Sequence, residues 1–309
     1  MSFEQAIVIG LIQGVAELFP ISSLGQTVLI PSLIGGSWAQ LVAQQASAES
    51  PYLAFVVGLH VATALALITY FWREWLAVIL GFFTSVTRRR IRGDDERLAW
   101  LIVMATIPVG LIGLLLEHPL RTLFAKPMAA ATFLTVNGLI LLTGEWLRRR
   151  NAQDRSRHAV KTANGFGRSG QADDRAARGD RRAADLSVRD AGIIGVLQTS
   201  ALLAGISRDG VCMVAGLARG LSREQAARFA FMLSAPPIFA AGLLKIPDLL
   251  GPLGNGIRPQ IVAGSVAAFL TAYFSVRFLV RYFQSGSLIP FAIFCLVFGT
   301  TCMIRFGLF

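Results

Sequence analysis

The fold of this chain follows from two stretches that repeat one another. Residues 9–25 read IGLIQGVAELFPISSLG, and residues 194–210 read IGVLQTSALLAGISRDG. At a fixed offset of 185 residues, 8 of the 17 positions are identical without a gap. An apolar bias would not by itself align a glutamine, a serine and two glycines. We therefore interpret the two stretches as copies of one ancestral segment.

Neither stretch is expected to form one continuous membrane-crossing helix. Pro20, Gly25 and the adjacent serines Ser22 and Ser23 interrupt the first copy early. Irregular backbone at membrane depth is tolerated where it is buried in protein or lines a wet cavity. Each copy therefore predicts a re-entrant helical hairpin with a polar tip. The first copy also lacks the basic leader of a secretory signal, so we expect it to stay in the mature protein.

The composition is that of a membrane protein. Of the 309 residues, 54% are hydrophobic and 15% are charged, whereas soluble domains carry about 25% charge. Disordered chains are excluded because they are poor in hydrophobic residues. Six stretches are long and apolar enough to cross about 30 Å of hydrocarbon. They lie near 51–73, 98–116, 128–147, 228–246, 259–282 and 288–306. The segment 75–87 is too short and is expected along the membrane interface.

The charges predict the orientation. The net charge is +11, and Lys and Arg concentrate in the hydrophilic regions 88–97 and 148–190. The positive-inside rule places both regions in the cytoplasm and, by counting spans, both termini outside. Residues 148–190 supply +6 of the charge and contain few aromatic residues, so we expect a disordered basic cytoplasmic loop. Without interleaved aromatic residues this loop does not indicate nucleic-acid binding.

These observations predict an all-α, polytopic membrane protein with one membrane domain, 1–309. Repeat 1 would cover 1–147 and repeat 2 would cover 191–309, each a re-entrant hairpin followed by three transmembrane helices. Three crossings are an odd number, so the second repeat starts on the opposite face and the repeats are inverted. The three cysteines lie in apolar runs and are expected to be small buried side chains. The sequence leaves open whether the protein forms a homodimer.

Polar side chains gather at the two predicted tips. Glu17 follows Gln13 by four residues, so both lie on one face of a helix. An ionisable residue inside a membrane is costly and is by default a functional candidate. We therefore expect Glu17 to pair with Arg208 across the interface between the repeats. The other candidates are Ser22, Ser23, Gln26, Gln198, Ser207 and Asp209.

These residue types suit a phosphorylated ligand held in the membrane. Arginine presents a planar fork that binds phosphate bidentately. The backbone amides around Gly205 and Gly210 would add neutral donors, and a helix N-terminus would add positive potential. A carboxylate repels phosphate unless it binds a metal ion or transfers protons. Glu17 therefore indicates a divalent cation, a general base, or both. Asp209 would be a further metal ligand or would hold Arg208.

The same residues carry a resemblance to a known family. The first hairpin reads Gln-Gly-Val-Ala-Glu at 13–17 and Pro-Ile-Ser-Ser-Leu-Gly-Gln at 20–26, and the second reads Ala-Gly-Ile-Ser-Arg-Asp-Gly at 204–210. Further matches lie at 58–63, 70–73, 221–223 and 289–291. Over nearly the whole chain except 148–190, these motifs resemble the bacterial undecaprenyl-diphosphate phosphatase family of the bacitracin-resistance type.

The resemblance implies hydrolysis of undecaprenyl diphosphate to the monophosphate and inorganic phosphate, which recycles the lipid carrier for peptidoglycan synthesis. It implies a multi-pass protein of the bacterial inner membrane and Mg²⁺ or Ca²⁺ as cofactor. With the N-terminus outside, we expect the site to open to the external face. Arg208 would clamp the diphosphate, Glu17 would bind the metal or activate the attacking group, and Ser23 would be the nucleophile or a phosphate donor. The positions implied to bind substrate are Gln13, Ser22, Gln26, Ser207, Gly205 and Gly210.

Three positions depart from the family motifs. Gln26 stands where the family usually has a histidine, Asp209 replaces a serine, and Ala204 replaces a proline. A glutamine hydrogen-bonds but does not accept a proton at physiological pH. If the motif histidine is essential, this chain is slow or inactive. His60 could substitute from span 51–73, but a lone histidine in a span is more often packed and hydrogen-bonded, so we favour Glu17 as the base.

Two other functions fit the same sequence. Inverted repeats with broken helices also suit a transporter that moves a prenyl phosphate across the membrane. A catalytically impaired, lipid-binding homologue is the second alternative, because Gln26 replaces the motif histidine.

Overall fold

The computed structural model of the chain describes residues 1–309 apart from 45–49, 117–122, 124–125, 163–180, 252–253 and 309. The regular elements of these described residues are helices, which confirms the predicted all-α class. An isolated bridge also joins Arg181 to Leu221. The helices are α1 (Phe3–Leu18), α2 (Ser23–Ile34), α3 (Gly36–Ala43), α4 (Pro51–Tyr70), α5 (Trp72–Arg88), α6 (Asp94–Leu115), α8 (Pro127–Thr162), η2 (Ala183–Asp185), α10 (Val188–Gln198), η3 (Thr199–Leu202), α11 (Arg208–Ala218), α12 (Arg223–Leu250), α13 (Arg258–Ser285) and α14 (Ile289–Leu308).

The first interrupted segment folds as a helical hairpin, α1 and α2. Ser2 caps α1 through a capping box with Gln5, which satisfies two of the free N–H groups at the helix start. The helix ends at Leu18 because the residue before a proline is driven out of the α conformation. Phe19, which precedes Pro20, is accordingly extended, with φ −68° and ψ 136°. The chain then turns back into α2.

The second interrupted segment folds in the same order from α10 through η3 into α11. Ser187 caps α10 through a capping box with Asp190, and it follows Ser2 by the same 185 residues that separate the repeated stretches. The turn before α11 contains Gly205 at φ +112°, a conformation that favours glycine. A Cβ at this position would lie 2.4 Å from the carbonyl oxygen of Ala130 on α8, so the turn also needs glycine for close packing.

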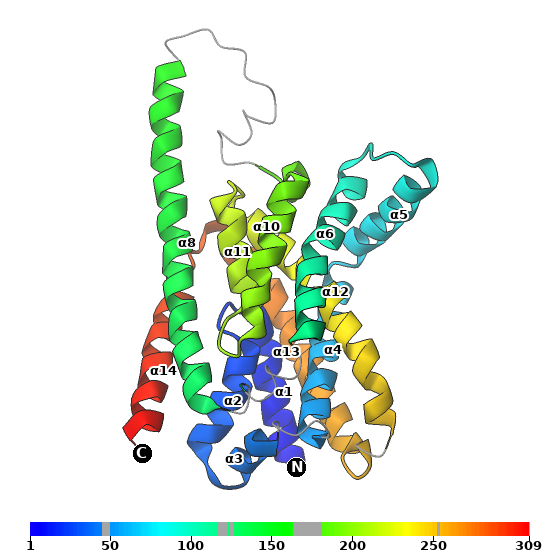
Figure 1. Cartoon of the computed structure of the whole chain (residues 1–309), viewed down its shortest axis with the longest axis vertical. Helices are drawn as coiled ribbons and strands as arrows, with labels where there is room; N and C mark the ends of the chain where they lie inside the picture. Colours follow the sequence, from blue (N-terminus) through cyan, green and yellow to red (C-terminus); the bar gives the residue numbers. More distant parts are fainter. Residues whose placement is uncertain (45–49, 117–122, 124–125, 163–180, 252–253, 309) are drawn as a thin grey trace.

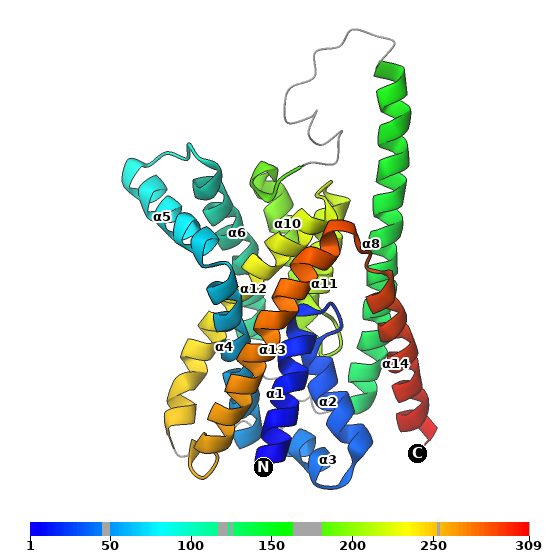
Figure 2. The same ribbon diagram turned by 180° about the vertical axis from the view of Figure 1, so that it is seen from behind.

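The two hairpins enter the molecule from opposite ends (Figure 1). α1 starts at the end where both chain termini lie, and α10 starts at the other end, beside the connection between α5 and α6. The view from behind shows α13 lying along α1 (Figure 2). The turns of the hairpins meet in the interior, where a Cβ on Gly25 would lie 3.0 Å from the Cα of Gly205.

Several helices are built to cross a membrane. Among the described residues, α6, α13, α14 and the part of α8 from Pro127 to Arg150 are long and apolar enough to do so. The outward side chains agree, since Val262, Phe274 and Val297 are each 63% exposed despite being apolar. Burial of Cys212, Cys295 and Cys302 as free thiols confirms the expectation for the cysteines.

One of the predicted spans differs from the structure. The span predicted at 51–73 is divided at Phe71, where α4 and α5 meet at an angle of 88°, and the two together pass the same test as one bent pair. The stretch 228–246 lies inside α12, whose C-terminal side chains are largely outside the described part of the structure, so this span stays a prediction.

The predicted disordered loop 148–190 also needs correction at both ends. α8 continues to Thr162, because residues 148–162 contain neither glycine nor proline and the helical hydrogen bonds can continue. At the other end, Arg181 donates to the carbonyl oxygen of Arg219 at 2.6 Å, and Arg182 pairs with Asp94 at 2.8 Å. The middle of the predicted loop, 163–180, lies outside the described residues.

Equivalent glycines of the two copies lie at close helix contacts. A Cβ on Gly10 of α1 would lie 2.3 Å from the carbonyl oxygen of Gly264 on α13, and a Cβ on Gly195 of α10 would lie 2.5 Å from that of Ala105 on α6. Both distances are shorter than the contacts that Cβ atoms make in real proteins. Each hairpin can therefore approach its neighbouring helix only with glycine at this position.

We expect Gly195→Ala to lower the stability of the protein by about 1–3 kcal/mol, because α10 and α6 must move apart. The measurement is thermal unfolding in detergent. Gly192→Ala on the same helix is the matched control, since a Cβ there meets open space. An equal Tm for the two variants would contradict the close packing of α10 on α6.

Candidate active site

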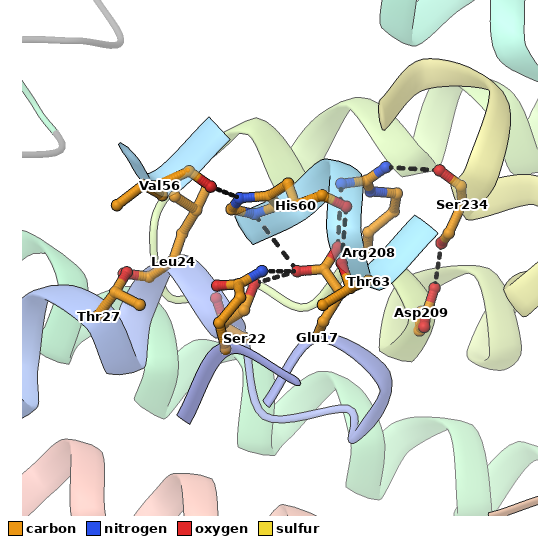
Figure 3. A network of polar contacts seen from close by, with 12 residues as sticks. Glu17, Ser22, Leu24, Thr27, Val56, His60, Thr63, Arg208, Asp209 and Ser234 are labelled. Atoms are coloured by element: carbon orange, nitrogen blue, oxygen red, sulfur yellow. Dashed lines mark hydrogen bonds and ion pairs between the residues drawn. The ribbon is translucent and has the colours of Figure 1, made fainter. Parts of the chain in front are cut away.

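The centre of the site is the carboxylate of Glu17, buried at the end of α1 with protein partners on both oxygens (Figure 3). Oε2 accepts a hydrogen bond from Nε2 of Gln13 at 2.9 Å and another from the hydroxyl of Ser23. Nε2 of His60 lies 3.3 Å from the same oxygen. Oε1 lies 3.6 Å from Nη2 of Arg208. The predicted pairing of Glu17 with Arg208 is therefore observed.

Arg208 is placed by the start of α11. It is the first residue of that helix, and its Nη1 donates to the carbonyl oxygen of Ser234 on α12 at 3.2 Å. The hydroxyl of Ser234 donates in turn to Oδ1 of Asp209. Asp209 thus holds α12 at the position where that helix supports Arg208. The Arg208 side chain is 23% exposed, against 6% for that of Glu17, so the guanidinium reaches toward accessible space.

The serines that precede the second helix of each hairpin are helix caps. Ser22 Oγ accepts from the N–H of Gly25 at 3.3 Å and from that of Gly205 at 3.1 Å, and Ser207 Oγ accepts from the N–H of Gly210 at 3.1 Å. The amides of Gly205 and Gly210, predicted as phosphate donors, therefore have intramolecular partners. Capping leaves fewer free backbone donors than the sequence suggests. Ser22, at φ +64°, also joins the two hairpins directly.

Asn137 is a site residue that the sequence analysis missed. It is fully buried on α8, where Nδ2 donates to the carbonyl oxygen of Pro20 at 2.9 Å and Oδ1 accepts from the N–H of Ser207 at 3.0 Å. One side chain thus satisfies a backbone group of each hairpin turn. A buried asparagine in an apolar span is a signal that could have found it, because buried polar groups need partners.

His60 also belongs to the site, although the sequence analysis favoured a packing role for it. It lies on α4, with Nδ1 2.8 Å from the carbonyl oxygen of Val56 and Nε2 facing Glu17. It is thus hydrogen-bonded within its own helix, as expected, and it contacts the central carboxylate as well. The sequence places His60 about 40 residues from Glu17, so this contact depends on how α4 packs against α1.

Gln26 is buried and hydrogen-bonds to the backbone of its own hairpin. Its Nε2 donates to the carbonyl oxygen of Ile21 at 3.0 Å, and its Oε1 is buried without a protein hydrogen-bond partner in the described structure. Three further atoms are buried without such a partner: Oε1 of Gln13, Oδ2 of Asp209 and Nε2 of Gln198. Gln198 accepts from the thiol of Cys212 at 3.4 Å rather than from a residue of the ion pair.

The described residues do not form a metal site by themselves. Within them, no group of three or more His, Cys, Asp and Glu side chains is arranged to hold a metal ion. Both oxygens of Glu17 face protein donors, and one oxygen of Asp209 accepts from Ser234. Oδ2 of Asp209 has no protein hydrogen-bond partner in the described structure, so the metal-ligand roles of Glu17 and Asp209 stay predictions.

One motif of the sequence lies outside the site. Arg223, from the stretch 221–223, pairs with Glu145 on α8 at 2.5 Å, and Arg148 pairs with the same carboxylate at 3.0 Å. Arg223 therefore links α12 to α8 and does not contact Glu17.

The sequence of the chain matches a known protein family and known proteins. A family model described as bacitracin resistance protein BacA matches residues 6–301. The chain belongs to this family. It is 53% identical to undecaprenyl-diphosphatase 2 of Frankia alni, with 100% of this chain and 99% of the relative aligned. It is 54% identical to the undecaprenyl-diphosphatase of Mycolicibacterium paratuberculosis (100% and 98%) and 40% identical to that of Acidiphilium cryptum (97% and 96%). The resemblance based on the two hairpin motifs is thereby confirmed.

We expect Asn137→Leu to destabilise this member of the BacA family by about 1–3 kcal/mol for each backbone group left unpaired. The substitution keeps the side chain's approximate size but removes the hydrogen bonds to both hairpin turns. Thermal unfolding in detergent measures the change. Thr143→Ala on the exposed face of α8 is the control, and a Tm as high as that of the control would contradict the bridging role.

Proposed function

We propose that the protein is an integral-membrane phosphatase that hydrolyses undecaprenyl diphosphate to undecaprenyl phosphate and inorganic phosphate. Membership of the BacA family and full-length relatives named undecaprenyl-diphosphatase support this substrate. Hydrolysis of the phosphoanhydride bond is supported by one observation: a hydroxyl and a guanidinium contact the same carboxylate. The Ser23 hydroxyl donates to Glu17, and Arg208 faces the other oxygen of that carboxylate.

The direct hydrogen bond from Ser23 to Glu17 favours Ser23 as nucleophile and Glu17 as its general base. The hydroxyl proton passes to Glu17 while a bond forms between Oγ and the terminal phosphorus. The bond from that phosphorus to the bridging oxygen breaks, and undecaprenyl phosphate leaves with the electron pair. Water then attacks the phosphoserine, Ser23 regains its proton from Glu17, and inorganic phosphate leaves.

Positive charge would hold the diphosphate beside Ser23. The guanidinium of Arg208 is partly exposed and suits the transferring phosphoryl group. α2 and α11 both begin at the turns of the hairpins, at Ser23 and Arg208. The N-terminus of a helix carries partial positive charge, so two helix starts reinforce the arginine. Gln13 and Gln26 would position the head group through their amide atoms.

We further propose that the two halves are inverted repeats, each a re-entrant hairpin followed by membrane-crossing helices. The equal spacing of Ser2 and Ser187, and of Gly10 and Gly195, supports this, as does entry of the hairpins from opposite ends (Figure 1). The protein would lie in the bacterial inner membrane with the site open to the periplasmic face. The basic stretches at the end opposite the termini support that orientation.

We propose that a divalent cation, Mg²⁺ or Ca²⁺, binds together with the substrate rather than to the protein alone. Mg²⁺ commonly keeps several waters and binds substrate phosphates with few protein ligands. Both oxygens of Glu17 and one oxygen of Asp209 face protein donors, so oxygens of the diphosphate would supply most of the ligands. Assays of the reaction should therefore be run with Mg²⁺, with Ca²⁺ and with a chelator.

We expect purified protein to release phosphate from undecaprenyl diphosphate and Ser23→Ala to lose that activity by at least ~100-fold. Colorimetric phosphate release in detergent micelles is the measurement, and Ser32→Ala, further along α2, is the control. Activity retained in Ser23→Ala would make water the direct nucleophile. If wild-type protein released no phosphate but moved the lipid between the leaflets of vesicles, the transporter would replace the phosphatase.

We expect Arg208→Ala to abolish binding of the diphosphate, because the guanidinium is the charged group that clamps it. Arg208→Lys keeps the charge but loses the bidentate fork, so a partial loss is expected. Tryptophan fluorescence titration with a short-chain prenyl diphosphate measures the affinity. Arg277→Ala, on the exposed face of α13, is the control, and unchanged affinity in Arg208→Ala would rule out the clamp.

A further inference from the structure

His60 lies in the stretch 58–63, which matches the family, and it contacts the carboxylate of Glu17. The motif histidine is replaced by Gln26 on α2, whereas His60 on α4 reaches the carboxylate of Glu17. We propose that His60 is the positioning residue of Glu17 in this chain and supplies the imidazole that position 26 lacks. The inference rests on the proposed phosphatase function, since it assigns His60 a part in that reaction.

The hydrogen bonds of the ring define where its protons lie. A backbone carbonyl can only accept, so Nδ1, 2.8 Å from the oxygen of Val56, must carry a hydrogen. A neutral imidazole with its hydrogen on Nδ1 has a bare lone pair on Nε2. That lone pair would face the Oε2 of Glu17 at 3.3 Å and repel it. The contact is favourable when one further proton lies between Nε2 and the carboxylate, so His60 and Glu17 share a proton.

The shared proton lies next to the hydroxyl that reacts. The same oxygen, Oε2, accepts the hydroxyl hydrogen of Ser23 and faces Nε2 of His60. A line of polar contacts therefore runs from Ser23 through Glu17 and His60 to the backbone of Val56. Figure 3 shows the part of it that joins Glu17, His60 and Val56. This is the arrangement of a nucleophile, a base and a third group that orients the base. His60 would fix the carboxylate for Ser23 without exchanging atoms with the substrate.

The surroundings bury His60 and hold α4 in place. The His60 side chain is 14% exposed, and the hydroxyl of Thr63 donates to the carbonyl oxygen of His60 at 2.8 Å. α4 is tied to α2 by Tyr52, whose hydroxyl donates to the carbonyl oxygen of Thr27 at 3.2 Å. The charged groups of this network are Glu17 on α1 and the neighbours Arg208 and Asp209 on α11, and α12 contributes the neutral Ser234.

Gln26 does not take the part of the motif histidine. It is 2% exposed and hydrogen-bonds to Ile21, so it serves α2 as a buried amide. An amide cannot share a proton with a carboxylate as an imidazole can. The chain thus keeps one imidazole in the site but carries it on a different helix.

The test is an exchange of the two side chains. We expect His60→Gln to lower kcat by ~100-fold with KM changed less than about threefold, since the substrate contacts persist while the base is misplaced. The double variant His60→Gln/Gln26→His should regain at least ~10-fold of the lost kcat. A wild-type kcat in His60→Gln, or a double variant no faster than His60→Gln, would overturn the inference.

A second measurement needs no substitution in the site. In a His118→Gln/His158→Gln background, His60 is the remaining histidine of the chain. Solid-state ¹⁵N NMR at neutral pH should then show a hydrogen on Nδ1 and a shared proton at Nε2. A spectrum with a bare, unperturbed Nε2 would overturn the inference even if His60→Gln failed to fold. If wild-type protein released no phosphate, the proposed function would fail, whereas the NMR result would still report on the His60–Glu17 contact.

Discussion

The structure depends on keeping a buried carboxylate satisfied inside a membrane protein. An ionised side chain taken out of water costs several kcal/mol unless a partner and hydrogen bonds compensate it. Glu17 obtains that compensation from four side chains on three other parts of the chain and its own helix. The three partners outside α1 must therefore be delivered by three separate elements: α2, α4 and α11. The need to satisfy one carboxylate thus constrains how these elements pack.

The second constraint is the backbone of the two hairpin turns. Their N–H and C=O groups cannot bond to water at membrane depth, so the protein must supply partners. Ser22 and Ser207 satisfy the helix starts, and Asn137 satisfies one group of each turn. Close packing at Gly25 and Gly205 leaves no space for side chains between the turns. These features let irregular backbone lie in the interior, where it can hold the reacting groups.

The departures from the family motifs gain a structural meaning from these contacts. Asp209, which replaces a serine, accepts from Ser234 and so acts on the helix that supports Arg208. Gln26 is a buried hydrogen-bonding residue of α2, and an imidazole reaches Glu17 from α4 instead. A motif compares positions along the chain, whereas the carboxylate responds to the groups around it in space. The same set of groups can therefore come from different helices.

The sequence by itself determined the helical class, the two broken hairpins and the pairing of Glu17 with Arg208, because proline, glycine and intramembrane charges have strong local consequences. Hydropathy also located four of the membrane-capable helices. Only the tertiary structure decided the bend at Phe71, the bridging by Asn137, the capping that occupies the amides of Gly205 and Gly210, and the contact of His60 with Glu17. These features depend on which helices pack together, and residue spacing along one helix does not contain that information.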